Sequence, residues 1–387
     1  MAENKSDASS ESSPEASPEI SEALTGLRES IAEVDRSLLE LINRRMELAA
    51  EVGRVKIGTG QPILVPEVHN RVLTRARQHA DACGVSEEVM ESIFKAVMRG
   101  SIERQHRVGV AMRAEGGSRL LILGGAGDMG GWFHNFAHLL GHPVDIVDPA
   151  MKPLPTVEGR FGSLDEIEDL GRYDAIIVSV PLARTSEVLE QLIERRCEAL
   201  IIEIASIKDS LLPTLEKATE AGLRTLSLHP MFGPRKSPYE SLTFALAYRD
   251  DPRREQELLG RWLKHPYTHL VPVPFQHHDR LMGWLLGFAH LLGMLFGSAL
   301  TRSGLGAAEL LACASTSYNR QASAALHVLA EDPDLYYEIQ RLNPHRGDVY
   351  LAAREALDQL IDSVQSDDRE RFREILADAR QFLVNDL

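Results

Sequence analysis

The stretch "LLILGGAGDMGGWF" carries glycines at a spacing that suits a phosphate group. It reads as an apolar run, a turn with the pattern G-x-G-x-x-G, and the start of a helix. Such glycines let the backbone turn tightly and approach a pyrophosphate, which binds at the helix N-terminus. The same pattern occurs in ordinary turns, so its place between strand and helix is what favours a dinucleotide site. The residues of the pattern are Gly125, Gly127, Asp128, Met129 and Gly130.

A carboxylate follows at the distance expected of a ribose-binding acid. The next apolar run, "VDIVD", ends in Asp148, eighteen residues beyond Gly130. A carboxylate there accepts hydrogen bonds from the adenosine ribose hydroxyls and repels a 2′-phosphate. The sequence therefore predicts NAD rather than NADP as cofactor, and the alternative is a surface aspartate beside a glycine-rich turn.

His229 is the candidate for proton transfer. It stands in "LSLHPMFGP", at the end of an apolar run, and Pro230 keeps it extended rather than helical. Ligands of open α/β sheets bind beyond the carboxyl ends of the strands. A histidine there can take a proton from a substrate hydroxyl while hydride leaves the same carbon. A structural hydrogen-bonding role is an equally good reading of His229 taken alone.

Alternating strands and helices must position these residues. The strand-like runs are "RLLILGG", "PVDIVDP", "DAIIVSVP", "ALIIEIAS" and "LRTLSLHP", with "LTFALAY" and "THLVPVP" later. This alternation predicts a parallel doubly wound sheet, a Rossmann-like α/β domain over residues 118–274. After Pro274 only helices are expected, so residues 275–387 are predicted to be all-α. The expected helices cover about 276–302, 306–330, 333–342 and 347–386.

A separate all-α domain is predicted over residues 22–110. Apolar residues in a 3.6-residue rhythm predict one helix over 24–57, with shorter helices after Pro66 and from Ser86 to about 108. A helix of that length cannot bury its apolar stripe in a compact three-helix monomer. We therefore expect it to pack against a second copy of the chain.

Composition limits the partners. The formal charge of −15 disfavours nucleic acid and anionic membrane, so a small-molecule substrate is expected. Cys83, Cys197 and Cys313 have neither zinc spacing nor a disulfide pattern, which predicts no metal site and fits a reducing cytoplasm. Residues 1–21 are rich in Ser, Glu and Pro, have no secretory core and are predicted to be a disordered tail.

One apolar segment has two interpretations. Residues 281–300 contain no Asp, Glu, Lys or Arg and place glycines at GxxxG spacing, which would suit a membrane span. A span would put residues 303–387 across a membrane from the nucleotide fold. We favour the other interpretation, a helix buried in a homodimer, and expect no membrane.

Several motifs together resemble a known family. "GGAGDMGGWF", "IIVSVP", "EIASIKDSLL", "LHPMFGP" and "HHDRLMGWLLGFAH" resemble prephenate dehydrogenase, and the upstream helices resemble the all-helical chorismate mutase. In this order they resemble the bifunctional chorismate mutase/prephenate dehydrogenase (T-protein) family of tyrosine biosynthesis, over about residues 22–380. The resemblance implies conversion of chorismate to prephenate, then NAD-dependent oxidative decarboxylation to 4-hydroxyphenylpyruvate.

The resemblance assigns roles in the dehydrogenase half. His229 would take the proton of the C4 hydroxyl, and Ser206 would support it and touch the substrate. Ser179 and Pro181 would lie along the cofactor near the nicotinamide. Two further histidines match histidines that recur in the family's helical domain, and a substrate-binding role and packing within a helix are equally good interpretations of both. They are His278 and His290.

In the mutase half the resemblance assigns Arg28, Arg45, Lys56 and Gln105. The rearrangement needs only a site that holds a dianion and stabilises charge on the ether oxygen. Arg45 and Lys56 are about 20° apart around a helix, so their side chains can converge. Arg28 is about 42 Å from Lys56 along that helix, so only an antiparallel partner chain can bring it to the site. The alternative is a solvated charged face.

Two departures from the family pattern keep alternatives open. His327 stands where the family has an arginine for the ring carboxylate, with Arg320 and Arg235 as substitute charges, so a variant substrate such as 4-amino-4-deoxyprephenate is possible. His69 stands where the family mutase has a glutamate, and Glu67 would face about 200° away. The helical domain is then a weak or inactive mutase that serves dimerisation. A third interpretation is an NAD-binding sensor without enzymatic activity.

Overall fold

The computed structural model describes residues 18–59, 61, 65–112, 117–150, 157–238, 240–263 and 268–385. The chain divides into two compact units, Met1–Met112 and Arg113–Leu387, and each is described by itself. The tail predicted for residues 1–21 lies outside the described residues up to residue 17. Residues 18–21 already belong to the first helix.

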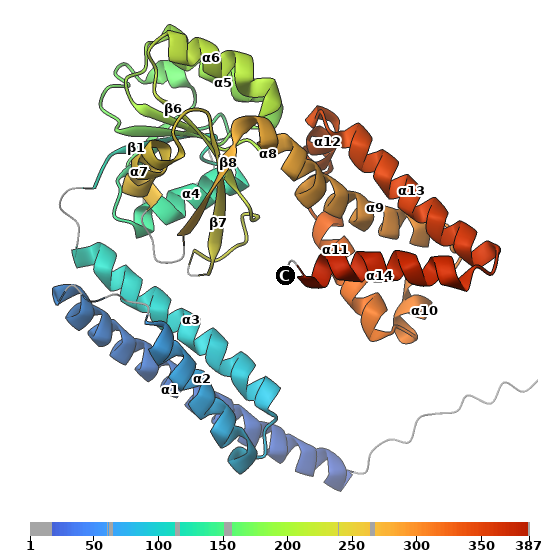
Figure 1. The fold of residues 1–387 in the computed structure, drawn as a ribbon. Helices are drawn as coiled ribbons and strands as arrows, with labels where there is room; N and C mark the ends of the chain where they lie inside the picture. The colour runs from blue at the N-terminus through green and yellow to red at the C-terminus, as the bar shows by residue number, and fades with distance from the viewer. Residues whose placement is uncertain are drawn as a thin grey trace, which may run out of the picture. The chain divides into compact units, whose positions relative to one another are not determined.

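The first unit consists of helices. They are α1 (Pro18–Gly58), α2 (Pro66–Ala80), the short 3₁₀ helix η1 (Asp81–Cys83) and α3 (Glu87–Met112). The predicted start of α3 is confirmed, because the Ser86 hydroxyl accepts a hydrogen bond from the Val89 N–H at 3.3 Å. A Cβ on Gly53 of α1 would lie 2.9 Å from Cα of Gln105, so α1 and α3 approach closely there (Figure 1).

The first half of α1 is left with an uncovered apolar stripe. Eight large apolar side chains between residues 24 and 42 are each 39–68% exposed. The buried members of α1, Ala49 and Ala50, lie in its second half, where Met46 and Gly53 face α3. A contiguous apolar surface of this length is typical of an interface. The exposed members are Leu24, Leu27, Ile31, Val34, Leu38, Leu39, Leu41 and Ile42.

The second unit is built on one eight-stranded sheet in the order β3-β2-β1-β4-β5-β6-β7-β8. The strands are β1 (Leu120–Leu123), β2 (Val144–Val147), β3 (Gly159–Phe161), β4 (Ala175–Val178), β5 (Leu200–Glu203), β6 (Thr225–Pro230), β7 (Leu242–Tyr248) and β8 (Thr268–Pro274). The first six are parallel, as the alternation predicted, while β3 was not predicted. Of the two later strands, β7 runs antiparallel to β6 and parallel to β8. No crossover helix separates β6 from β7, so the chain returns in the opposite direction.

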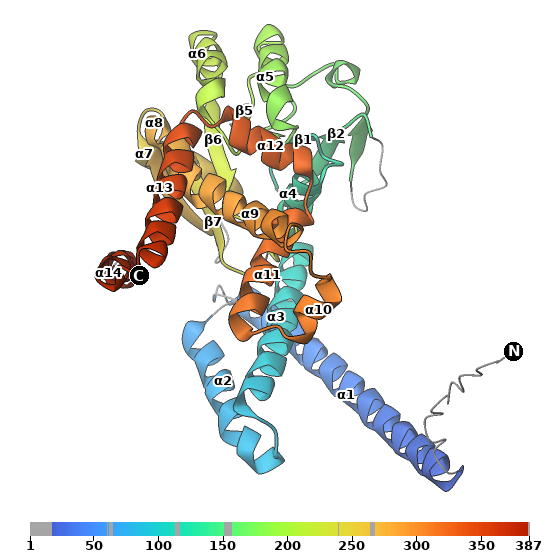
Figure 2. The ribbon, with the colours of Figure 1, turned by 90° about the vertical axis from the view of Figure 1, so that its right-hand side faces the viewer.

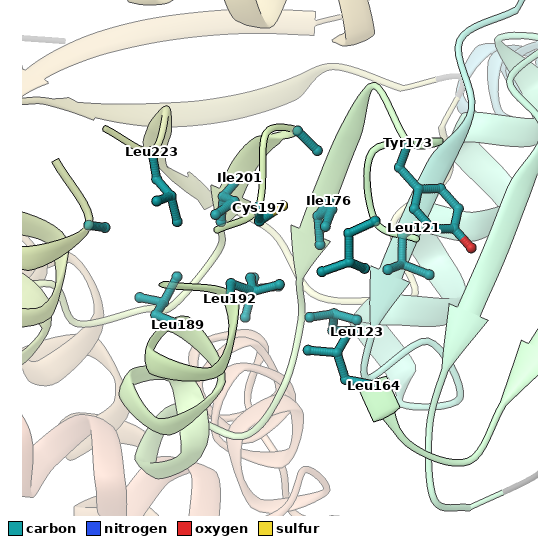
Figure 3. Packing of buried hydrophobic residues seen from close by; sticks show 14 of the residues in the cluster. Leu121, Leu123, Leu164, Tyr173, Ile176, Leu189, Leu192, Cys197, Ile201 and Leu223 are labelled. Carbon is teal, nitrogen blue, oxygen red and sulfur yellow. The ribbon is translucent and has the colours of Figure 1, made fainter. Parts of the chain in front are cut away.

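Helices cover both faces of this sheet (Figure 1). The helices α5 (Thr185–Glu194) and α6 (Leu212–Glu220) lie on one face, and α4 (Asp128–Leu139) and α7 (Pro252–Leu263) lie on the other. Under α5 and α6, the leucines Leu189 and Leu192 pack on Ile176 and Ile201 of the strands (Figure 3). Strands buried on both faces explain the continuous apolar runs of the sequence.

The chain after Pro274 is helical, as predicted. The elements are α8 (Phe275–Met282), the π-helical turn η5 (Gly283–Phe288), α9 (Ala289–Leu300), α10 (Ala307–Ala312), α11 (Thr316–Leu329), α12 (Pro333–Leu342), α13 (Arg346–Gln365) and α14 (Arg369–Asn385). Two predicted helices are split. Ser315 caps α11 by accepting the Tyr318 N–H at 3.1 Å, and Asp367, with φ +54°, ends α13. In Figures 1 and 2, α9 lies beside α11.

The continuous helical run Phe275–Leu300 is long and apolar enough to cross a membrane by length and composition alone. The start of this run argues against a membrane span, because His278 and Asp279 are buried there in hydrogen bonds to the nucleotide-binding part of the chain. Its exposed apolar side chains include Trp284, Leu285 and Leu295. They form a surface that the rest of the described chain does not cover.

Candidate active sites

The glycine-rich turn forms a close-packed cradle between β1 and α4. Gly124 has φ +80°, and a Cβ on it would lie 2.2 Å from the Ser179 carbonyl oxygen. A Cβ on Gly125 would lie 2.6 Å from Cβ of Ile146, and one on Gly130 would lie 2.1 Å from the Gly124 carbonyl oxygen. Larger residues are therefore excluded at these positions. The first turn of α4, which begins at Asp128, opens from this cradle, and the N–H groups of a first helical turn have no partner within their own helix, as a pyrophosphate requires.

Asp148 lies directly after β2, beside the cradle. Its carboxylate accepts hydrogen bonds from the Ala126 N–H at 3.0 Å and the Ala150 N–H at 2.8 Å. The acid is thus fixed against the glycine turn, at the carboxyl end of the strand next to β1. These features fit a dinucleotide whose ribose hydroxyls meet Asp148.

The other predicted dehydrogenase residues follow neighbouring strands of the same edge. Ser179 and Pro181 follow β4, Ser206 follows β5, and His229 is the second-last residue of β6. Because β1, β4, β5 and β6 are parallel, these residues lie together at the carboxyl ends of the strands, near the point where the strand order reverses. Ser206 is half-buried.

His229 is the first member of a buried hydrogen-bonded chain. Its Nδ1 lies 3.1 Å from Nε2 of His278, and Nδ1 of His278 lies 2.7 Å from Oδ1 of Asp279. All three side chains are buried. Both ring nitrogens of His278 are therefore occupied by hydrogen bonds within the protein.

The carboxylate of Asp279 is anchored from the other side by two backbone groups. The Lys208 N–H donates to both of its oxygens at 2.9 and 3.0 Å, and the Asp209 N–H donates to Oδ2 at 2.8 Å. The Lys208 ammonium is itself fully buried. It donates to both carboxylate oxygens of Glu203 at 2.7 and 2.8 Å and to the Leu228 carbonyl at 2.9 Å. This network fixes the backbone immediately before His229.

These surroundings set the protonation states. Burial lowers the pKa of His229 well below 6.5, and the neighbouring His278 and Lys208 lower it further. Burial also lowers the pKa of His278, against the hydrogen bond that it donates to Asp279. For Asp279, burial acts to raise the pKa, but the hydrogen bonds from His278, Asp209 and Lys208 outweigh it and the net pKa is lowered. At neutral pH both histidines are neutral and Asp279 is ionised.

A second group of polar residues gathers on the C-terminal helices. The His290 ring meets the Tyr336 ring edge-on at 4.4 Å, and burial followed by the charge of His327 lowers the pKa of His290 to about 4. Arg235, from the loop after β6, forms an ion pair with Glu331, which precedes α12. The structure thus brings His290 near His327. Arg320 is exposed on α11.

The helical unit brings Arg45 and Gln105 to the contact of α1 with α3, and Lys56 lies eleven residues after Arg45 on α1. The Arg45 guanidinium donates to the Val97 carbonyl at 3.2 Å and to the Ser101 hydroxyl. Burial lowers the pKa values of Arg45 and Lys56. The buried Oε1 of Gln105 has no hydrogen-bond partner among the described residues.

Arg28 does not join this group within one chain. It lies exposed on the same straight helix as Lys56, 28 residues away, which corresponds to about 42 Å. His69 lies on α2, but its side chain is outside the described residues.

The sequence interpretation missed the anchoring residues Glu203, Lys208, Asp279 and Ser101. One signal was present, since Glu203 interrupts the apolar run "ALIIEIAS", where a charge is buried only if it is paired. Among the described residues, no group of three or more His, Cys, Asp or Glu side chains is placed to hold a metal ion.

A glycine cradle at the switch point of a doubly wound sheet, with a buried histidine at the same edge, defines a dinucleotide-dependent dehydrogenase. Family descriptions match the chain in three places. Residues 27–106 match "Chorismate mutase type II", residues 156–249 match "Prephenate dehydrogenase, nucleotide-binding domain", and residues 274–378 match "Prephenate dehydrogenase, dimerization domain". The glycine cradle precedes the second match and is recognised from its geometry.

Curated relatives cover both halves. The chain is 30% identical to the T-protein of Enterobacter agglomerans over 82% of this chain and 81% of that protein. It is 28% identical to the T-protein of Haemophilus influenzae over 91% and 90%. Prephenate dehydrogenase from A. aeolicus, solved with hydroxyphenyl propionate and NAD⁺, shares the fold with a TM-score of 0.58 at 17% identity, over 70% of this chain and 98% of that one.

The chain belongs to the T-protein family. It is a bifunctional enzyme of tyrosine biosynthesis that joins a chorismate mutase to a prephenate dehydrogenase, and NAD is the cofactor of the dehydrogenase half.

Proposed function

We propose that His229 is the general base of the dehydrogenase half and that prephenate is its substrate. His229 takes the proton of the C4 hydroxyl while the hydride on C4 is transferred. The bond from the ring to its carboxylate then breaks, CO₂ leaves, and its electron pair completes the aromatic ring. The observation that carries this proposal is the chain from Asp279 through His278 to His229.

The hydrogen-bonded chain from Asp279 to His229 sets the tautomer of each ring. An ionised carboxylate only accepts hydrogen bonds, so neutral His278 carries its proton on Nδ1 and presents a lone pair at Nε2. His229 must then donate from Nδ1, which leaves its Nε2 without a proton. A neutral imidazole with a free Nε2 is the form that accepts a proton from a hydroxyl. Asp279 and His278 are thus positioning residues.

NAD supplies a hydride acceptor when bound. We propose that the glycine cradle and Met129 hold its pyrophosphate, that Asp148 holds the adenosine ribose, and that Ser179 and Pro181 line the nicotinamide end. Asp128, at the first position of α4, belongs to the same wall. What supports this is that all these residues lie at the carboxyl ends of β1, β2 and β4.

We propose that Ser206, His290, Arg320 and His327 form the substrate end of the site. His290 and His327 interact electrostatically, and Arg235 adds a cation to the same helices. Because the chain as a whole carries −15, an anionic substrate needs local cations, which here are the guanidinium groups of Arg320 and Arg235, since His290 is neutral at neutral pH. His278 is left out of this group because both its ring nitrogens are occupied.

In the mutase half we propose that Arg45, Lys56 and Gln105 of one subunit and Arg28 of the partner subunit surround chorismate. The exposed apolar stripe of α1 supports a homodimer, because a second, antiparallel copy would cover it and carry Arg28 across. The uncovered side of the Phe275–Leu300 run supports a second contact between copies. We further propose that the dimer works in the cytoplasm, free of membrane and nucleic acid.

One experiment tests the substrate. NADH formation should be measured with prephenate and with 4-amino-4-deoxyprephenate side by side, using the full chain. We expect prephenate to give the higher kcat/KM by at least about tenfold, since a hydrogen-bonded hydroxyl is strongly discriminated. A preference for the amino compound would assign the variant substrate, and no NADH from either would leave only NAD binding.

Asp279→Asn should impair the dehydrogenase through the wrong tautomer. The carbonyl oxygen of the new amide would face the Lys208 and Asp209 N–H groups, so its NH₂ group would face His278. His278 would then donate from Nε2, and His229 would carry its proton on the nitrogen that must accept one. We expect kcat with prephenate to fall by about 10²–10⁴-fold, as with other misplaced imidazole tautomers, while chorismate consumption stays unchanged.

Asp209→Asn is the matched control, because the Asp209 side chain lies one residue from Lys208 but contributes only its backbone N–H to the network. Its kcat should stay within about twofold of wild type, as expected of an exposed substitution. Equal activity of Asp279→Asn and wild type would exclude the tautomer argument.

A further inference from the structure

The loop that follows His229 contacts two parts of the second unit. One lies at the proposed dinucleotide site and the other at the proposed substrate end. This loop, residues 231–238, is the first part of the connection from β6 to β7. On one side it meets α4, the helix that starts at the glycine cradle. On the other side it meets the connection between α11 and α12, through the ion pair of Arg235 with Glu331.

The contact with α4 is made by Trp132. The indole Nε1–H donates to the Lys236 carbonyl oxygen at 2.7 Å, across 104 residues of sequence. The indole ring also lies 4.8 Å from the ring of Phe232, three residues after His229. Trp132 is buried, while Phe232 and Lys236 on the loop are half-buried.

An aromatic cluster extends this contact into the sheet. The Trp132 ring stacks on Phe136 at 4.9 Å, and Phe232 meets Phe244 edge-on at 5.1 Å. Phe244 lies on β7 opposite Pro230, the residue after His229. The cofactor helix, the loop and the strand that carries His229 are therefore packed as one body around Trp132.

The sheet alone does not fix the position of loop 231–238 relative to α4. The strand β1 before α4 and the strand β6 before the loop are separated by β4 and β5. A pyrophosphate bound at the N-terminus of α4 acts on that helix, which presents Trp132 one turn further on. Any change in the position of α4 is passed to the loop through one hydrogen bond and one ring contact.

We propose that Trp132 is a positioning residue that couples dinucleotide binding to prephenate binding. With the dinucleotide on α4, Trp132 holds loop 231–238 so that His229 and the Arg235 side of the loop meet the substrate together. This inference rests on the proposed role of His229 in the dehydrogenase site.

The test measures coupling rather than rate. NADH cannot accept a hydride, so prephenate bound beside it does not react, and the dissociation constant of prephenate can be measured with and without saturating NADH. We expect wild type to bind prephenate at least about fivefold more tightly with NADH, the lower end of ordinary coupling. In Trp132→Phe, which keeps a ring but lacks the N–H donor, this ratio should fall at least about threefold, towards one, the effect of losing one hydrogen bond.

Two further variants keep the test decisive. Phe232→Leu removes the ring contact on the loop side and should lower the same ratio, even if Trp132→Phe folds poorly. Trp262→Phe is the control, because Trp262 lies on α7 and its ring packs on His142 rather than on the loop. Its ratio should equal that of wild type.

The outcomes separate the inference from the proposed function. An unchanged ratio in both Trp132→Phe and Phe232→Leu, or a wild-type ratio of one, overturns the coupling role of Trp132 while prephenate oxidation stands. Absence of prephenate-dependent NADH formation in wild type overturns the proposed substrate instead.

Discussion

His229→Asn is expected to abolish NADH formation from prephenate while chorismate still disappears at the wild-type rate. Asparagine can occupy the place of the imidazole and donate to His278, but it cannot take up a proton at neutral pH. Loss of a positioned general base costs about 10²–10⁴-fold in kcat. The two activities are followed separately, as NADH absorbance with prephenate and as chorismate loss without NAD.

The control for this substitution is His269→Asn, which replaces an exposed histidine on β8 of the same sheet. Both activities of that variant should match wild type. Binding of NAD to His229→Asn should also be unchanged, because the glycine cradle lies on β1 and α4. Substantial NADH formation by His229→Asn would show that another group accepts the proton.

The parts of the fold that sequence predicted are those where the local signal and the tertiary environment agree. The apolar run 120–123, the glycines after it and Asp148 after the next run each meet a requirement visible in a few residues. Strands buried on both faces need apolar side chains throughout, and a cradle for a pyrophosphate needs glycine. His229 was found for the same reason, because the end of a parallel strand is a defined place.

The anchoring network could not be predicted in this way. Lys208 and Glu203 are charged residues without any exposure, and their burial is acceptable only because each is paired with the other. Asp279 lies 71 residues from the Lys208 N–H that it accepts. Sequence alone does not state which distant groups meet, so a buried ion pair looks like two surface charges.

The angle between His278 and His290 around their helix is a second feature that the sequence alone could not predict. On a regular helix, residues twelve apart differ by about 120° around the axis. The π-helical turn Gly283–Phe288 lies between them and accommodates one extra residue, so the difference falls to about 20°. The Gln340 amide donates to the Gly287 carbonyl at 2.8 Å within that turn. Both histidines were named from the sequence, but their alignment depends on a contact from another helix.

The mutase half leads to the prediction with the other large effect. Arg28→Ala and Lys56→Ala should each lower the rate of chorismate rearrangement by about 10²–10³-fold, because each removes a cation that stabilises the reacting dianion. Neither should change NADH formation from prephenate, which takes place in the other unit. Chorismate loss and NADH formation in the same preparations measure both effects.

Co-expression of the two inactive variants tests the shared site. If Arg28 reaches the site of the partner subunit, a heterodimer of Arg28→Ala with Lys56→Ala contains one site in which all four residues are intact. Random pairing makes half of the dimers mixed, so about a quarter of the wild-type mutase activity should return. Co-expression of Arg45→Ala with Lys56→Ala is the matched control, since both residues belong to the same subunit's share of the site and every site stays damaged. Recovery in the first pair and none in the second requires an antiparallel dimer through α1, whereas no recovery in either pair would mean that Arg28 serves its own chain or no site.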